Sequence, residues 1–229
     1  MRKLSIIIPC YNESRTIEEI LHRAIRASLP GWDREIIVVD DGSTDGTREI
    51  LKNLDLPIIR IFQEKNGGKG TAVCAGIDRA SGSYVITQDA DLEYNPNEIH
   101  KLLSVIDAGV ADVVYGSRTL IPQDGVKGPA VLRLGVWFLT QMVNILYGLA
   151  LTDICTCYKL FPREASDAHS AGGFESDILL APALSRRGYR FAEVPILYSP
   201  RNAAQGKKIS YRDGLYAIWA IIIDRLRHL

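Results

Sequence analysis

The stretch VITQDADLEYNP, residues 85–96, joins a short apolar strand to a pair of carboxylates. Residues 84–87 are β-branched or aromatic, the side chains favoured in strands. Asp89 and Asp91 follow with only Ala90 between them, so in extended chain both carboxylates point the same way. At a separation of about 4 Å near a protein surface, two such charges repel by about 4 kcal/mol. The stretch therefore predicts a strand that ends at a ligand able to offset this repulsion.

Strand and helix patterns alternate on both sides of this stretch, from residue 4 to residue 116. Strict alternation implies a mostly parallel, Rossmann-like sheet with helices on both faces, so the predicted fold class is α/β. Ligands of such sheets bind at the carboxyl ends of the strands. The patterns predict strands at residues 4–9, 35–39, 58–62, 84–88 and 112–116, and helices at 16–28, 47–53, 69–80 and 96–108.

The second half of the chain contains two long apolar segments. Residues 134–151 carry no charge, and their length is at the lower end of what spans a membrane. We interpret them as a buried or interfacial helix that breaks at Gly148. Residues 211–229 predict an amphipathic helix with Leu215, Ile218, Trp219, Ile222 and Leu226 on one face. That face fits core packing and a membrane surface equally well.

Composition favours an ordinary globular protein. The 229 residues suit one large domain, and 27 basic residues balance 27 acidic ones, which gives no indication of a nucleic-acid partner. The four cysteines do not suggest a disulfide scaffold, and no second Cys/His pair has zinc spacing. The basic, apolar start is too short for a signal peptide, so we expect reduced thiols and a cytoplasmic location. The role of Cys155 and Cys157 and the oligomeric state stay open.

Acidic, basic or glycine-rich groups follow five predicted elements of the sheet. They are PCYNE at 9–13, DDGSTDGT at 40–47, NGGKG at 66–70, DAD at 89–91 and GSR at 116–118. Each alone is weak, because DDGS is also typical of a turn and a helix cap, and the glycine stretch is neither a Walker loop nor a dinucleotide fingerprint. Together they lie on one edge of the sheet. A carboxylate pair suits Mg²⁺ with substrate phosphates, and Lys69 and Arg118 suit phosphate, so the inferred ligand is a nucleoside diphosphate with a leaving group.

The order PCYNE, DDGSTDGT, GKGTA, DADL and GSR resembles glycosyltransferase family 2, whose fold is GT-A, and DAD resembles that family's DxD motif. The later motifs TD at 152–153, YKLF at 158–161, FE at 174–175 and EVPI at 193–196 look most like the dolichol- or polyprenyl-phosphate sugar transferase branch. The resemblance covers roughly residues 4–210. It implies a single GT-A domain over residues 1–229, with a nucleotide-sugar half at 1–120 and an acceptor half at 121–229.

The resemblance also implies a role for particular residues. Asp89 and Asp91 would hold Mg²⁺ or Mn²⁺ against the diphosphate. The basic segment 200–210 would bind the acceptor, although its spacing from Arg201 to Gly206 is longer than the branch usually has. The implied nucleotide-binding residues are Pro9, Tyr11, Glu13, Asp41, Lys69, Asp89 and Ala90; the catalytic residues are Asp91, Arg118, Glu175 and Asp177; the acceptor-binding residues are Asp153, Arg201, Lys207 and Lys208.

The implied reaction is a displacement with inversion at the anomeric carbon, from GDP-mannose or a UDP-hexose to a lipid phosphate. A phosphate acceptor is already an anion, whereas a glycan hydroxyl acceptor needs a base with a pKa near 6–7, for which Glu175, Asp177 and Asp153 are the candidates. A binding module without turnover and a nucleotidyltransferase are further alternatives. A lipid acceptor implies peripheral contact with the cytoplasmic face of a membrane, supported by basic residues that flank the two apolar segments: Arg133, Lys207, Lys208, Arg212, Arg225 and Arg227.

Overall fold

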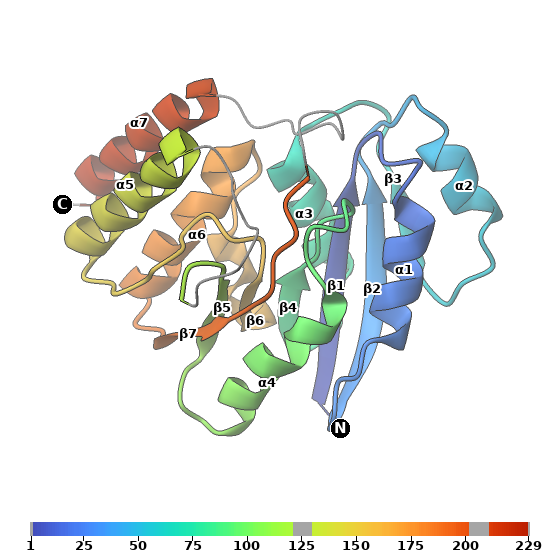
Figure 1. Ribbon diagram of the computed structural model, residues 1–229, viewed down its shortest axis with the longest axis horizontal. Helices are drawn as coiled ribbons and strands as arrows, with labels where there is room; N and C mark the ends of the chain where they lie inside the picture. The colour runs from blue at the N-terminus through green and yellow to red at the C-terminus, as the bar shows by residue number, and fades with distance from the viewer. Residues whose placement is uncertain (1, 121–129, 202–210, 229) are drawn as a thin grey trace.

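The computed structural model describes residues 2–120, 130–201 and 211–228, which form a single sheet covered by helices (Figure 1). The strands are β1 (Arg2–Cys10), β2 (Trp32–Asp40), β3 (Ile59–Phe62), β4 (Tyr84–Thr87), β5 (Val113–Ser117), β6 (Lys159–Pro162) and β7 (Phe191–Pro195). The helices are α1 (Ile17–Arg26), α2 (Thr47–Asn53), α3 (Lys69–Arg79), α4 (Ile99–Asp107), α5 (Ala130–Tyr147), α6 (Phe174–Arg186) and α7 (Tyr211–Arg227), with 3-10 turns η1 (Pro96–Glu98) and η2 (Arg163–Ala168).

The strand order is β3-β2-β1-β4-β6-β5-β7. The strands β1 to β4 pair in parallel, β6 runs antiparallel to both β4 and β5, and β5 pairs in parallel with β7. The predicted mostly parallel α/β sheet is therefore confirmed. Among the described strands only β6 is reversed, which the sequence patterns did not predict, and it joins the first half of the sheet to the second.

The sheet is buried on both faces, which explains the continuous apolar runs in its central strands. Alternate residues of β1 show the two layers: Ile6 and Ile8 pack with the apolar faces of α1 and α4, whereas Ile7 packs with α3 and α6 on the opposite face. Figure 1 shows α5, α6 and α7 together at one end of the sheet and α1 and α2 at the other. The carboxyl ends of β1, β2 and β4 lie between these two groups.

The apolar segments of the second half form helices, with different limits from those predicted. The helix predicted at 134–151 begins earlier, at Ala130, and ends at Tyr147. It ends there because Gly148 takes a left-handed conformation with φ +68°, at the position of the predicted break. Leu139 and Val143 are buried, whereas Trp137 and Phe138 are exposed. In α7 the buried side chains are Ala217 and Ile221, so much of the face predicted to be apolar points outward. Within the described ranges, no helix is long and apolar enough to cross a membrane.

Candidate active site

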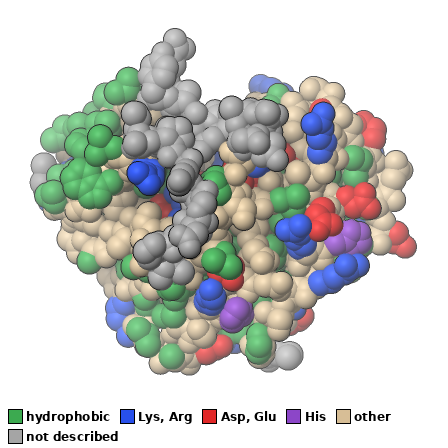
Figure 2. Space-filling model, viewed as in Figure 1, with side chains coloured by type: hydrophobic (Ala, Val, Ile, Leu, Met, Phe, Trp, Pro, Cys, Tyr) green, Lys and Arg blue, Asp and Glu red, His purple; other side chains and the backbone are tan. Residues whose placement is uncertain are grey.

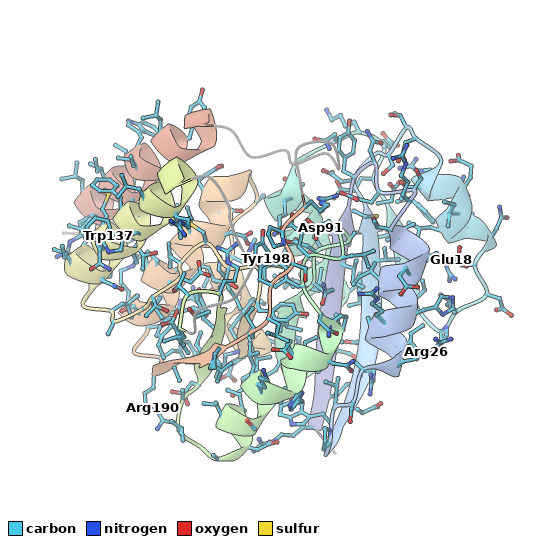
Figure 3. All side chains as sticks on the ribbon, in the orientation of Figure 1. Glu18, Arg26, Asp91, Trp137, Arg190 and Tyr198 are labelled. Carbon is cyan, nitrogen blue, oxygen red and sulfur yellow. The ribbon has the colours of Figure 1, made fainter. Side chains whose placement is uncertain are left out.

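A cleft of 460 Å³ opens at the carboxyl ends of β1, β2 and β4. Figure 3 labels two side chains that line it, Asp91 and Tyr198, near the centre of the molecule. Eleven predicted site residues line this cleft: Pro9, Tyr11, Glu13, Asp41, Lys69, Asp89, Ala90, Asp91, Arg118, Asp177 and Arg201. Asp153 and Glu175 lie outside its lining, and Lys207 and Lys208 lie outside the described residues. The structure thus brings most of the predicted set together.

The Asp41 carboxylate orders the glycine loop that leads into α3. Its two oxygens accept hydrogen bonds from the backbone N–H groups of Gly67 and Gly68, at 2.8 and 2.9 Å. The next residue, Gly42, has φ +73°, and a Cβ there would lie 2.7 Å from the backbone nitrogen of Asn66. Burial raises the pKa of Asp41. Asp41 was predicted to bind the nucleoside. In the structure its carboxylate holds the backbone of the glycine loop, which faces the cleft.

The carboxylates of Asp89 and Asp91 are each paired with a cation. Lys69 Nζ lies 2.7 Å from Asp89 Oδ1, and Arg201 Nη2 lies 2.8 Å from Asp91 Oδ2. Their repulsion is therefore partly offset by cations on other elements, and these two ion pairs were not predicted. Even so, burial together with the charges of Asp89 and Glu93 raises the pKa of Asp91 to about 7. Negative charge remains in excess around Asp91.

Arg201 is the centre of this acidic part of the cleft. Its guanidinium lies 3.1 Å from Glu13 Oε2, 2.8 Å from Asp91 Oδ2 and 3.7 Å from Glu93 Oε1. Its backbone N–H also donates to Glu93, at 2.8 Å. Arg201 thus connects two segments that follow strands, at Glu13 and Asp91, which lie 188 and 110 residues before it in the chain.

The carboxylates of this site fit a divalent cation that also binds phosphate. The described residues contain no ready-made group of three or more His, Cys, Asp or Glu ligands. Mg²⁺ typically takes one or two protein carboxylates and completes its shell with water and substrate phosphates. A dication beside Asp89 and Asp91 would also relieve the charge that raises the pKa of Asp91. The metal role of this pair stays a prediction that its donor set supports.

Arg118 is held at the end of β5 by a buried carboxylate. Its Nε and Nη2 donate to Asp153 at 2.6 and 2.8 Å, and its guanidinium lies over the ring of Tyr198, 5.0 Å from the centroid. Asp153 is fully buried, and its backbone N–H donates to Glu193 at 3.1 Å. Asp153 was predicted to bind acceptor. The structure places it behind Arg118, where it positions the guanidinium that lines the cleft.

Asp177 joins the cleft to the layer behind it. Its carboxylate lies 3.2 Å from Lys69 Nζ and 3.4 Å from His169 Nε2, and its backbone carbonyl accepts from Lys159 at 2.6 Å. Burial alone would raise the pKa of Asp177, but Lys69, Lys159 and His169 together hold it well below its ordinary value. Glu175 instead accepts a hydrogen bond from the backbone N–H of Gly173 at 3.0 Å, at the start of α6.

Sequence reasoning missed about half of the lining. Tyr94 and Tyr198 pack together with ring centroids 5.2 Å apart, and Glu93 accepts a hydrogen bond from the Tyr198 hydroxyl. Glu93 was two residues from Asp91 in the quoted stretch, the same spacing that singled out the DAD pair. Cys10, Asn66 and Gly68 lie within the PCYNE and NGGKG motifs but were not named as site residues. The remaining missed residues carry no such signal: Ala72, Val136, Cys155, Cys157 and Gly173.

Comparison with known proteins identifies the family. Residues 5–169 match the model of glycosyl transferase family 2. The chain belongs to this family. A curated relative, the undecaprenyl-phosphate 4-deoxy-4-formamido-L-arabinose transferase of Pseudomonas fluorescens (strain Pf0-1), is 31% identical over 212 residues, which are 89% of this chain and 59% of that protein. The chain spans 51% to 63% of the length of the curated relatives compared.

Solved structures confirm the GT-A fold. Glucosyl-3-phosphoglycerate synthase from Mycobacterium tuberculosis, in complex with Mg²⁺ and uridine diphosphate, superposes with a TM-score of 0.74 at 22% identity, over 98% of this chain and 79% of that one. The same enzyme with Mn²⁺, uridine diphosphate and glucosyl-3-phosphoglycerate gives a TM-score of 0.70 at 22% identity, over 98% and 80% of the two chains.

Proposed function

We propose that this family 2 glycosyltransferase moves a sugar from a nucleoside-diphosphate sugar to a polyprenyl phosphate, with inversion at the anomeric carbon. An oxygen of the acceptor phosphate forms the new bond to that carbon, and the bond to the donor diphosphate breaks. The similarity to undecaprenyl-phosphate sugar transferases supports this acceptor. The chain's own residues supply a second, independent reason.

The observation that carries the proposal is the lack of a suitable base among the predicted candidates. A hydroxyl acceptor needs a base with a pKa near the working pH, whereas a phosphate is already an anion. The three cations around Asp177 hold its pKa well below that range. Asp153 is buried in its pair with Arg118, and Glu175 does not line the cleft. Asp91, with a pKa near 7, would lose its capacity as a base once a dication is bound to it.

On the donor side, the residues at the ends of β1 and β2 and the glycine loop would bind the nucleoside and the diphosphate. Asp89 and Asp91 would hold Mg²⁺ or Mn²⁺, and solved structures of the same fold with either ion and uridine diphosphate support this assignment. When bound, the ion supplies Lewis acidity to the leaving diphosphate. Lys69 lies beside Asp89 and would add a positive charge near the same phosphates.

On the acceptor side, Arg118 and Arg201 are the described cations suited to an anionic phosphate. Arg118 is fixed in orientation by Asp153, so its guanidinium is presented to the cleft without further ordering. Arg201 would exchange its carboxylate partners for phosphate oxygens. Lys207 and Lys208 keep their predicted acceptor role, which no described contact tests.

We also propose that the molecule binds the cytoplasmic face of an anionic membrane through the outward faces of α5 and α7. Large apolar side chains are exposed there, with Trp137 at 57% and Trp219 at 64%. Figure 2 shows hydrophobic side chains gathered at the end of the molecule where these helices lie. Such a surface would bring the cleft to an acceptor whose hydrocarbon chain lies in the bilayer.

The deciding experiment compares two acceptors that differ in one group. Release of nucleoside diphosphate from a panel of GDP- and UDP-sugars is measured with Mg²⁺ and either polyprenyl phosphate or polyprenol. We expect at least tenfold faster release with the phosphate and none above background with the alcohol. Equal rates with both, or transfer only to a glycan hydroxyl, would contradict the proposal. Arg118→Gln should raise the KM for the phosphate acceptor more than the KM for the donor.

A further inference from the structure

Behind the cleft, three side chains form a Cys–His–Asp arrangement that the proposed reaction does not use as such. Cys74 lies on α3, His169 follows η2, and Asp177 lies on α6. Cys74 Sγ is 3.6 Å from His169 Nδ1, and His169 Nε2 is 3.4 Å from Asp177 Oδ1. A nucleophile within reach of an imidazole that a third group orients is the geometry of an activated nucleophile.

The imidazole of His169 is the charged partner of the sulfur. Burial would lower its pKa, but hydrogen bonds and charge interactions with Asp177 and Cys74 raise it to about 9, so the ring is protonated at neutral pH. The groups facing the ring come from both packed helices, Cys74 on α3 and Asp177 on α6. Lys69 and Lys159 face Asp177 from its other sides. A partly exposed cysteine beside a cationic group is the kind of environment in which reactive thiols are found.

The other cysteines lack this environment. Cys155 is also partly exposed, but burial and the charge of Asp153 raise its pKa to about 12. Cys10 and Cys157 are buried, and burial raises the pKa of each further. Cys74 differs from these three cysteines in having the His169 imidazole beside it.

We propose that Cys74 is a nucleophilic thiol that small electrophiles, hydroperoxides in particular, modify, and that its modification weakens donor binding. The thiolate sulfur attacks one peroxide oxygen, the O–O bond breaks and an S–O bond forms. The sulfur is oxidised by two electrons to a sulfenic acid, and the leaving hydroxide takes up a proton to become water.

A chain of contacts connects this thiol to the donor site. His169 contacts Asp177, Asp177 pairs with Lys69, and Lys69 pairs with Asp89 at 2.7 Å. Once the sulfur is oxidised, the added oxygen must find room beside the buried ring of His169. The second half of the proposal rests on the proposed function of Asp89, whereas the reactivity of Cys74 does not.

Labelling with iodoacetamide, read by mass spectrometry of each cysteine peptide, tests the reactivity. At pH 7 we expect Cys74 to react at least tenfold faster than Cys155, its partly exposed control in the same molecule. His169→Gln should slow Cys74 at least tenfold and leave Cys155 unchanged. Equal rates for the two cysteines, or no effect of His169→Gln, would overturn the proposal.

Calorimetry of uridine diphosphate with Mn²⁺, before and after treatment with hydrogen peroxide, tests the coupling. We expect at least threefold weaker binding by treated wild-type protein and no change in treated Cys74→Ser. Equal weakening in both proteins, or none in the wild type, would overturn the coupling. If untreated protein binds no nucleotide, the proposed donor site fails, and the labelling results still decide the reactivity of Cys74.

Discussion

Asp153 and Arg118 form a pair whose carboxylate is fully buried, so each depends on the other for its charge to be stable. Asp153→Asn would leave the guanidinium beside a neutral amide, and removing one partner of a buried pair typically costs about 3–5 kcal/mol. Because Arg118 is partly exposed, we expect a loss of about 3 kcal/mol in urea unfolding, with a rise in acceptor KM. The exposed pair Asp112–Arg190 is the control, and Asp112→Asn should leave stability within measurement error.

Asp91 differs from Asp153 in the effect of its charge. Burial and the neighbouring carboxylates raise its pKa to about 7, so ionisation of this group opposes folding. We expect Asp91→Ala to abolish turnover and metal-dependent nucleotide binding by calorimetry, with a metal-free unfolding free energy close to wild type. A large loss of stability without metal would mean that the pair with Arg201 is mainly structural.

The same residues show what the sequence could and could not predict at this scale. The acids at strand ends were predicted correctly as members of one cleft, because parallel strands bring their carboxyl ends together. Lys69 and Arg201 were also predicted as site residues, but their ion pairs with these acids were not, since Arg201 lies 110 residues from Asp91 and no local pattern encodes that contact. The hydrogen bonds that the glycine loop donates to Asp41 were missed for the same reason.

At the scale of elements, close contact between α3 and α6 depends on Gly70. A Cβ there would lie 2.2 Å from Ser176 Oγ and 2.6 Å from the backbone oxygen of Gly172. Gly70→Ala should therefore lower the unfolding free energy by about 1–3 kcal/mol, the usual cost of overpacking, and weaken nucleotide binding beside Lys69. Gly135 is the matched control: nothing lies within 4 Å of its Cβ position in α5, so Gly135→Ala should stabilise by about 0.5–1 kcal/mol. Two variants of equal stability would contradict this account of the helix contact.

Glu35 on β2 connects three elements at the opposite end of the sheet. It accepts from Ser5 on β1, from Ser81 and Gly82 before β4, and pairs with Lys3 at 2.8 Å. Burial would raise the pKa of Glu35, but these partners lower it to about 2. A carboxyl whose folded pKa is depressed contributes stability above its unfolded value, near 4.5, and loses it as the pH falls toward 2.

Glu35→Gln removes that contribution. We expect the variant to be less stable than wild type by about 2 kcal/mol above pH 5, with the difference shrinking between pH 4.5 and pH 2. Denaturant unfolding at five pH values measures this. A difference that stays constant down to pH 2 would show that the carboxylate charge is not what stabilises the junction.

The sequence patterns missed β6, β7 and α6, and each miss has a physical reason. The strands β6 and β7 are four and five residues long and form through pairing with distant strands. The strands β3 and β4 are equally short, but they lie in the regular alternation of strand and helix that ends after β5. Helix α6 contains Pro182, which argues against a helix interior on local grounds. In contrast, β1 and β2 each have nine residues, and their buried apolar runs made the first half of the fold predictable.

At the scale of the whole molecule, the outward faces of α5 and α7 carry most of the large hydrophobic side chains that are exposed in the described chain. Its members with more than half of their surface exposed are Leu134, Trp137, Ile145, Leu215, Tyr216, Trp219 and Leu226. Arg133 and Arg227 are exposed at the ends of the two helices. Figure 3 shows Trp137 at the edge of the molecule, away from the cleft. Helix α5 also contributes Val136 to the cleft lining, so this surface and the active site share an element.

This arrangement predicts salt-sensitive membrane binding. Each basic residue near an anionic surface contributes about 1 kcal/mol, and the aromatic side chains add a hydrophobic contribution that salt does not screen. In co-sedimentation with anionic vesicles, Trp137→Asp combined with Trp219→Asp should weaken binding at least tenfold. Val110→Asp is the matched control, because Val110 is 62% exposed beyond the end of α4, outside this surface. If wild-type protein stays in the supernatant at low salt, or if the double variant binds as Val110→Asp does, these helices are not the membrane contact and another partner must cover them.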